Sequence, residues 1–233
     1  MTDSSRLVDP TQIDHTELRT LATYNDIRRL CFEATRCGFG VVAIHPIHCT
    51  RAAAWLRGSG VGIAAVVGFS TGAFTIEGKA FEARDAIERG ATEIDFVINV
   101  GALRGGRHQL VLDEMRTLRE AAQGHTVKAI IETSVLIDEE KRLACELAVD
   151  AGLDYVETST GFASGGATAE DVRLLHEVGG GAIEVKASGG IRDAQTALAM
   201  IEAGASRLGT STGVQIAQPM ASMSDDLDRE ETE

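Results

Sequence analysis

The chain has 233 residues and a net charge of −13, from 22 lysines and arginines against 35 acids. An acidic chain without a basic stripe is not expected to bind nucleic acid. No run of about 18 apolar residues is present, so we expect no membrane span. The N-terminus lacks the order of a secretion signal, which favours the cytoplasm. The four cysteines show no CxxC spacing and are interpreted as reduced thiols.

Short β-branched segments alternate with helical patterns along nearly the whole chain. We predict strands near residues 12–15, 41–44, 62–67, 93–98, 127–131, 154–157, 183–186 and 207–209. Helices are predicted at residues 24–37, 49–56, 75–89, 109–122, 138–151, 168–178 and 193–203, with a short one after Gly213.

Several of these strands are almost entirely apolar, as expected for parallel strands covered on both faces. The alternation predicts an α/β protein with a single (β/α)8 TIM barrel over residues 1–218. An open doubly wound sheet is the alternative. Residues 219–233 are predicted to form an acidic, disordered tail, because residues 222–233 hold six acids and one arginine.

Active sites of such barrels lie at the carboxyl ends of the strands. Polar residues gather at these predicted ends. They are Asp14, His15 and Thr16 after the first strand, His45 after the second, Asp95 and Asn99 at the fourth, Lys128 and Glu132 at the fifth, Glu157, Thr158 and Ser159 at the sixth, and Lys186 and Ser188 at the seventh.

The centre of the expected site is the pair Glu157 and Lys186, which neighbouring parallel strands would place side by side. A lysine within an apolar barrel strand is costly unless it is paired or used. A desolvated lysine can attack a carbonyl and form a Schiff base. A structural ion pair with a carboxylate is the alternative, and Asp95 likewise can relay protons or anchor a lysine.

Two further residues leave alternatives open. Lys128 can face the barrel interior or lie at the bottom of the barrel with its ammonium in water. His45 and His48, together with Asp95 and Glu157, have the donor types of a metal site. A strand-end histidine is more often a hydrogen-bonding wall residue, so we predict no metal, and no organic cofactor is implied.

The glycine-rich loops after the seventh and eighth strands predict a phosphate site. Backbone N–H groups in such loops bind anions, and these two loops often hold phosphate in TIM barrels. Ordinary tight turns are the alternative. The candidate residues are Ser188, Gly189, Gly190, Ser211 and Thr212, with Gly161 from the preceding loop. A phosphorylated small molecule is therefore the expected partner.

Taken in order, these motifs resemble the deoxyribose-phosphate aldolase family over residues 12–218. The motifs are IDHT at 13–16, VVGF and TGA within 66–73, EIDFVINVGAL at 93–103, VKAIIET at 127–133, TSTGF at 158–162, GGAT at 165–168, VKASGGIR at 185–192 and LGTSTGV at 208–214. The resemblance implies a TIM barrel that cleaves 2-deoxyribose 5-phosphate to glyceraldehyde 3-phosphate and acetaldehyde through a lysine Schiff base. It also implies a possible homodimer.

The resemblance assigns Asp95 as the proton-relay aspartate and Lys186 as the second, pKa-lowering lysine. It assigns phosphate binding to Gly161, Gly189, Gly190, Ser211 and Thr212. The family's Schiff-base lysine directly precedes TSTGF, and here that position is Glu157. Two more departures are Arg19 and Thr20, where the family usually has lysine and proline, and His45 at the exit of the second strand.

The substitution at position 157 leaves three readings open, because glutamate cannot form an imine. In the first, the protein is an aldolase whose nucleophile has moved to Lys186, although a neighbouring carboxylate should raise the pKa of that lysine. In the second, Glu157 is a general base and the Lys186 ammonium stabilises an oxyanion, in an isomerase, dehydratase or imine-free lyase. In the third, the protein only binds a sugar phosphate.

Overall fold

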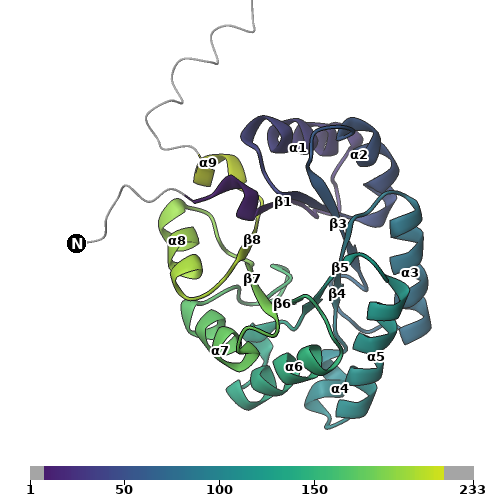
Figure 1. The fold of residues 1–233 in the computed structure, drawn as a ribbon, viewed down its shortest axis with the longest axis vertical. Coiled ribbons are helices and arrows are strands. Elements are labelled where there is room, and N and C mark those ends of the chain that lie inside the picture. Colours follow the sequence, from purple (N-terminus) through teal and green to yellow (C-terminus); the bar gives the residue numbers. More distant parts are fainter. Residues whose placement is uncertain (1–7, 218–233) are drawn as a thin grey trace, which may run out of the picture.

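The computed structural model describes residues 8–217 and contains a closed barrel of parallel strands (Figure 1). The strands are β1 (Ile13–Glu17), β2 (Val41–Ile44), β3 (Gly62–Val67), β4 (Glu93–Val97), β5 (Thr126–Ile130), β6 (Tyr155–Glu157), β7 (Glu184–Ser188) and β8 (Arg207–Thr210). Each strand pairs with the next, and β8 closes on β1. The predicted (β/α)8 barrel is confirmed and the open sheet is wrong. The predicted acidic tail, residues 219–233, lies outside the described residues.

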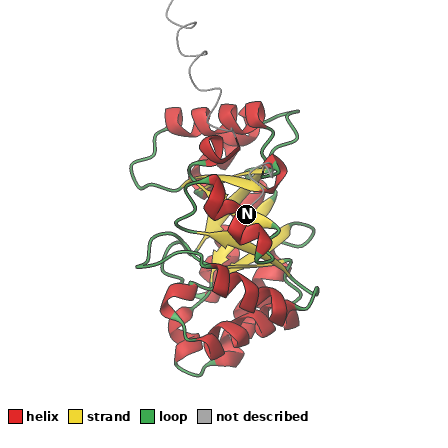
Figure 2. Cartoon of the chain, turned by 90° about the vertical axis from the view of Figure 1, so that its left-hand side faces the viewer, coloured by secondary structure: helices red, strands yellow, loops and turns green. Residues whose placement is uncertain are grey.

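Helices surround the barrel, and a side view shows them on both sides of the strands (Figures 1 and 2). The α-helices are α1 (Tyr24–Cys37), α2 (Cys49–Trp55), α3 (Ile76–Glu88), α4 (Val100–Arg104), α5 (His108–Ala121), α6 (Asp138–Asp150), α7 (Ala169–Gly179), α8 (Ala194–Glu202) and α9 (Gly213–Ala217). Short 3-10 turns occur at η1 (Pro10–Gln12), η2 (Pro46–His48) and η3 (Thr133–Val135). No helix within residues 8–217 is long and apolar enough to cross a membrane.

Local capping explains where several helices begin. Thr23 and Asp26 form a reciprocal capping box at the start of α1. Thr168 accepts a hydrogen bond from the Asp171 N–H at the start of α7. The short helix α4 was not predicted. It begins because the Asn99 side chain accepts a hydrogen bond from the Ala102 N–H at 2.9 Å.

The first strand runs further than predicted, to Glu17, because Asp14 to Glu17 all pair with β2. Asp14 and Thr16 therefore lie on the strand and not after it. Between them, His15 points to the outer layer, where its Nε2 lies 2.8 Å from Glu33 Oε2 and its ring packs against Phe39. The alternation of a strand sends Asp14 and Thr16 to the barrel interior instead.

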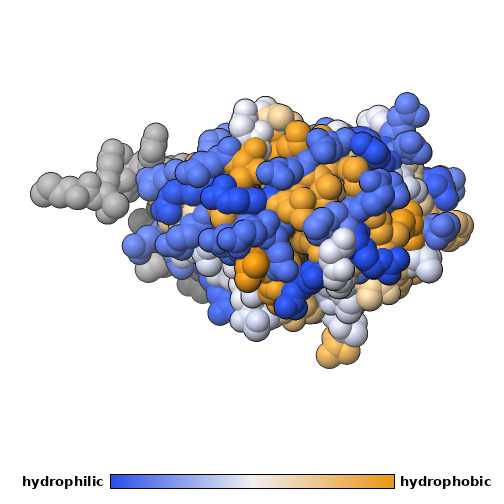
Figure 3. Space-filling view, turned by 90° about the horizontal axis from the view of Figure 1, so that it is seen from below, coloured by the Kyte–Doolittle hydropathy of each residue, from blue (hydrophilic) through white to orange (hydrophobic). Residues whose placement is uncertain are grey.

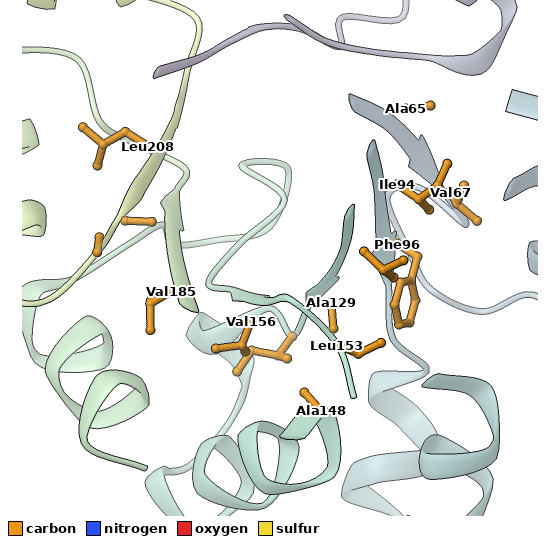
Figure 4. Close-up of a cluster of buried hydrophobic side chains, with 14 of the residues drawn as sticks. Ala65, Val67, Ile94, Phe96, Ala129, Ala148, Leu153, Val156, Val185 and Leu208 are labelled. Atoms are coloured by element: carbon orange, nitrogen blue, oxygen red, sulfur yellow. The ribbon is translucent and has the colours of Figure 1, made fainter. Parts of the chain in front are cut away.

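The large apolar core lies outside the barrel, between strands and helices. Figure 4 shows strand side chains such as Phe96 and Val156 directed toward the helical layer, with Ala148 of α6 facing them. Inside the barrel, a separate and much smaller apolar cluster consists of Val41, Ala43 and Ala64. Charged side chains also lie in the interior, and the candidate site is built from these.

Candidate active site

Lys186 occupies the centre of the barrel interior. Its Nζ lies 2.6 Å from Asp95 Oδ2, 2.9 Å from Asp14 Oδ2 and 3.3 Å from Glu157 Oε1. All four side chains are buried. Glu157 and Lys186 are direct partners in the β6–β7 register, so their side chains leave adjacent strands on the same face. Glu157 and Lys186 thus lie side by side as expected, and the structure adds Asp95 to the pair.

A second layer of charge lies below this centre. Lys128 Nζ donates to Asp95 Oδ1 at 2.7 Å, pairs with Glu93 and lies 3.5 Å from Asp14 Oδ2. Arg207 contacts Asp14 at 2.9 Å and Glu93 at 3.4 Å. Lys128 therefore faces inward, and the alternative with its ammonium in water is wrong. The Asp95 carboxylate bridges Lys128 and Lys186.

The interior network leaves one carboxylate without a matching cation. Across the two layers, the described chain places four carboxylates, Asp14, Glu93, Asp95 and Glu157, against Lys128, Lys186 and Arg207. The network is neutral if one acid holds a proton. Burial raises the pKa of Glu157 to about 7, and the nearby Asp95 charge adds to this against the opposing effect of Lys186.

Lys186 is held as an ammonium. Burial alone would lower the pKa of Lys186, but the charges of Asp14, Asp95 and Glu157 outweigh burial and raise this pKa well above its ordinary value. A neutral amine, which nucleophilic attack on a carbonyl requires, is therefore strongly disfavoured at this position. Within this pair, Glu157 is the group that can exchange a proton near neutral pH.

A pocket of about 520 Å³ opens above the network, at the carboxyl ends of the strands. Nine of the predicted site residues line it. These are Thr16, Asp95, Glu157, Gly161, Lys186, Ser188, Gly189, Gly190 and Ser211. Glu157 Oε2 is buried and has no hydrogen-bond partner within the described residues. One oxygen of Glu157 thus faces Lys186, and the other is an unpaired acceptor at the pocket wall.

Five predicted residues lie outside the pocket wall. Asp14 and Lys128 are beneath the floor. Thr158 exchanges hydrogen bonds of 3.0 Å with the backbone of Ser188, so its hydroxyl joins the loop after β6 to the end of β7. His45 Nε2 lies 3.2 Å from the carbonyl of Leu18. The hydroxyl of Thr212 faces the carbonyl of Ile191 at 3.4 Å. These five side chains therefore lie behind the residues that line the pocket and do not face it.

The glycine loops after β6 and β7 pack backbone against backbone. Gly161, Gly189 and Gly190 all have positive φ, at 80°, 85° and 79°, which favours glycine. A Cβ atom on Gly166 would lie 2.3 Å from the carbonyl oxygen of Gly189. Within the described residues, the N–H groups of Gly161, Gly189, Gly190 and Ser211 have no acceptor. Such free donors beside a pocket suit an anion.

The family model for "DeoC/LacD family aldolase" matches residues 10–219. The chain belongs to the DeoC/LacD aldolase family. It is 53% identical over 207 residues to deoxyribose-phosphate aldolase of Geobacillus sp., covering 88% of this chain and 93% of the relative. The corresponding enzyme of Brevibacillus brevis is 52% identical over 204 residues, covering 88% and 92%. The tetrameric deoxyribose phosphate aldolase of Aeropyrum pernix superposes with a TM-score of 0.84 at 32% identity, covering 89% and 88%.

Membership of the DeoC/LacD family makes the chain an aldolase-type carbon–carbon lyase. Within the described residues, no group of three or more His, Cys, Asp or Glu side chains is arranged for a metal ion. In the interior network, lysine ammonium groups stand between the carboxylates. In this member of the DeoC/LacD family, the groups that face the pocket floor are thus a carboxyl and an ammonium.

Sequence reasoning missed several pocket residues of this DeoC/LacD aldolase. Arg19, Arg29 and Arg192 bring positive charge to the pocket, and Phe69 and Phe162 form an aromatic wall with ring centroids 5.2 Å apart. Arg192 lies inside the quoted VKASGGIR motif, so its position next to the predicted phosphate loop was the available signal. Arg19 stands where the family usually has a lysine, and that position was its signal. Arg29, Phe69 and Phe162 come from α1 and separate loops, and no local pattern brings them together.

Proposed function

We propose that the protein is an imine-free carbon–carbon lyase for a small phosphorylated sugar or aldehyde. Glu157 acts as the acid/base, and the Lys186 ammonium stabilises the oxyanion. The observation that carries the proposal is the buried pair itself, with Glu157 Oε1 3.3 Å from Lys186 Nζ and Glu157 Oε2 unpartnered at the pocket. A carboxyl with a pKa of about 7 beside a fixed ammonium suits enolate chemistry near neutral pH.

The cleavage follows from the roles of these two groups. The ionised Glu157 removes the proton of the hydroxyl that is β to the substrate carbonyl. The carbon–carbon bond breaks, the hydroxyl carbon becomes an aldehyde, and the bonding pair moves through the α-carbon to the carbonyl oxygen. Lys186 stabilises the enolate oxygen. Glu157 then returns its proton to the α-carbon, which releases the second carbonyl product and restores the carboxylate.

The glycine loops supply the proposed phosphate anchor. The N–H groups of Gly161, Gly189, Gly190 and Ser211 would bind the phosphate, and Ser188 and Thr212 keep the loops in place through their side-chain contacts. The substrate suggested by the relatives' names is 2-deoxyribose 5-phosphate. In that substrate the phosphate is several bonds from the reacting carbons, which suits a phosphate at the pocket rim and chemistry at its floor.

Two other functions can be distinguished from the proposed one: an aldolase that forms an imine on Lys186, and a protein that only binds a phosphosugar. Imine formation on Lys186 would need the neutral amine that the three neighbouring carboxylates disfavour. A protein that only binds a phosphosugar would leave the free oxygen of Glu157 without a role. Neither reading explains the raised pKa of Glu157 as directly as acid/base chemistry does.

We also propose that the protein works as a homodimer in the cytoplasm, where phosphorylated sugars are retained. Large apolar side chains are exposed on one sector of the helical layer: Phe32 on α1, Ile47 on η2 and Phe81 on α3 are 64%, 66% and 68% exposed. By contrast, the face seen from below in Figure 3 interleaves apolar with hydrophilic residues. Light scattering of Phe32→Glu against wild type tests the dimer.

Turnover of 2-deoxyribose 5-phosphate by the Glu157→Gln variant tests the proposed function. Glutamine keeps the size and hydrogen-bonding shape but cannot accept the hydroxyl proton. We expect kcat to fall by about 10²- to 10⁴-fold, the usual contribution of a general base. Glu202→Gln on the exposed face of α8 is the matched control and should retain wild-type rates. Undiminished turnover by Glu157→Gln would overturn the proposal, and saturable binding without turnover by the wild type would favour the binder.

A further inference from the structure

Glu132 is a buried carboxylate for which neither the family resemblance nor the proposed chemistry has a role. It follows β5 and is 6% exposed. Its backbone is left-handed, with φ 58° and ψ 64°, and it is the non-glycine residue with positive φ in the described chain. Such a conformation costs roughly 1–3 kcal/mol in a residue with a side chain. A strained and buried glutamate beside a pocket calls for a specific function.

The Glu132 side chain reaches across to the loop after β6. Its Oε2 accepts two hydrogen bonds from Thr160, one from the N–H at 3.2 Å and one from the hydroxyl at 2.5 Å. The Thr160 hydroxyl in turn accepts the N–H of Phe162 at 3.1 Å. The N–H groups on both sides of Gly161 are thereby engaged, while the N–H of Gly161 itself stays free. Thr160 and Gly161 both line the pocket.

The same two loops are joined at a second point, where the N–H of Thr133 donates to the carbonyl of Thr158 at 2.8 Å. That backbone bond fixes the start of the TSTGF loop, and Glu132 fixes its middle. Glu132 and Thr133 are neighbours in the chain, and both contact the TSTGF loop. Thr133 does so through its backbone N–H and Glu132 through its side chain, which the left-handed backbone at residue 132 directs toward the loop. The strained backbone conformation of Glu132 is therefore the one in which its carboxylate reaches Thr160.

We propose that Glu132 is a positioning residue that sets the TSTGF loop so that the Gly161 N–H points at the phosphate of the substrate. The inference rests on the phosphate site of the proposed function. Charge alone argues that the role is geometric, because a carboxylate near a bound phosphate would oppose anion binding. Glu132 does not touch the reacting atoms and acts through Thr160.

Inorganic phosphate is the probe, with its affinity measured by titration calorimetry on the full chain. Glu132→Ala removes both bonds to Thr160 and should weaken phosphate binding about tenfold. Glu132→Gln keeps an acceptor oxygen in place and should stay within about threefold of wild type. In turnover, Glu132→Ala should raise KM for a phosphorylated substrate with little change in kcat, a split that general loss of folding would not produce.

Glu114→Gln is the matched control. Glu114 is also a buried glutamate, but it pairs with Lys79 in the outer layer, at 2.6 Å. The Glu114→Gln substitution should lower the melting temperature of the protein without a selective change in its affinity for phosphate. Thr160→Val tests the route, since the Glu132→Ala/Thr160→Val double variant should bind phosphate no more weakly than Glu132→Ala alone if both act through one contact.

The outcomes separate the two proposals. If wild type binds phosphate and folded Glu132→Ala binds it within twofold, the positioning role is wrong and the phosphate site stands. If Glu132→Ala fails to fold, folded Thr160→Val decides. It removes the hydroxyl bonds to Glu132 and Phe162 and keeps only the Thr160 N–H bond, and unchanged phosphate affinity in that variant also overturns the role. If wild type binds no phosphate in this pocket, the anion site of the proposed function is wrong, and this inference is wrong with it.

Discussion

Glu157 Oε1 lies 3.3 Å from Lys186 Nζ, in a barrel interior where both side chains are almost fully buried. The pair joins an acid whose pKa is raised to about 7 with an amine whose pKa is raised well above its ordinary value. Two neighbouring lysines would repel and favour one neutral amine. This carboxyl–ammonium pair instead provides an exchangeable proton on Glu157 and a fixed positive charge on Lys186.

The first prediction concerns the pH dependence of activity. Cleavage begins with ionised Glu157, so kcat/KM should be low near pH 5.5 and rise to a plateau above a pKa near 7. The measurement is a pH profile of kcat/KM. A rate that is flat from pH 5.5 to 8.5, while substrate binding is also flat, would remove Glu157 as the base.

Stability should change with pH in the opposite sense. The pKa of Glu157 is higher in the folded protein than in the unfolded chain, so its protonation favours the folded state at low pH. That contribution is lost as the pH rises from about 4.5 through 7. Thermal melts at pH 5.5 and 8.5 should show that Glu157→Gln loses less stability over this interval than wild type. Equal losses in both proteins would mean that Glu157 ionises without penalty.

Glu157→Lys should introduce imine chemistry. The substitution changes four carboxylates and three cations into three carboxylates and four potential cations, so one lysine in the interior is driven toward its neutral form. We expect cleavage of 2-deoxyribose 5-phosphate with a borohydride-trapped adduct on residue 157. Glu157→Gln is the control without a new amine. A folded Glu157→Lys protein with no adduct would show that other parts of the site have also diverged.

Asp95 should be important for stability as well as activity. Asp95→Asn removes the charge that bridges Lys128 and Lys186, and breaking a buried ion pair in this way costs about 3–5 kcal/mol. Urea unfolding gives the free energy. Asp85→Asn, which breaks an exposed pair with Arg89, should cost far less, because solvent screens an exposed ion pair. Similar costs for the two variants would contradict the structural role of the network.

The glycine loops give a prediction with an internal control. Gly190 and Gly124 both have positive φ, at 79° and 85°, and a Cβ on either meets no atom within 4 Å. Alanine at each position should therefore cost a similar amount of stability, roughly 1 kcal/mol, through backbone strain. Only Gly190→Ala should also weaken the affinity for inorganic phosphate. Equal phosphate affinity in both variants would place the anion elsewhere.

The barrel and the central pair followed from local sequence patterns. Eight apolar segments alternating with helices leave few other folds, and Glu157 and Lys186 sit at matching places on strands that are neighbours in the chain. The direction of Lys128 did not follow, because it depends on the pairing register with Asp95 on β4. The sequence of one strand, taken alone, does not show which of its two faces points into the barrel.

Contacts between distant segments were beyond local reasoning. Lys79 on α3 donates at 2.6 Å both to Glu114 on α5 and to the carbonyl of Val97 at the end of β4. The sequence analysis singles out neither residue, since both lie within predicted helices, yet the structure buries them and pairs them with each other. Thr212 shows the opposite case, since a hydroxyl expected in the pocket satisfies a neighbouring carbonyl instead. Both outcomes depend on the packing of segments far apart in the chain.

Borohydride trapping during turnover of 2-deoxyribose 5-phosphate tests the central claim most directly. Peptide mass spectrometry would locate any reduced adduct, with Glu157→Lys as the control that shows the trap works. The account predicts turnover by the wild type with no adduct on Lys186 or any other lysine. A substrate-dependent adduct on Lys186 would contradict it, because it would show that a lysine surrounded by three carboxylates still acts as the nucleophile.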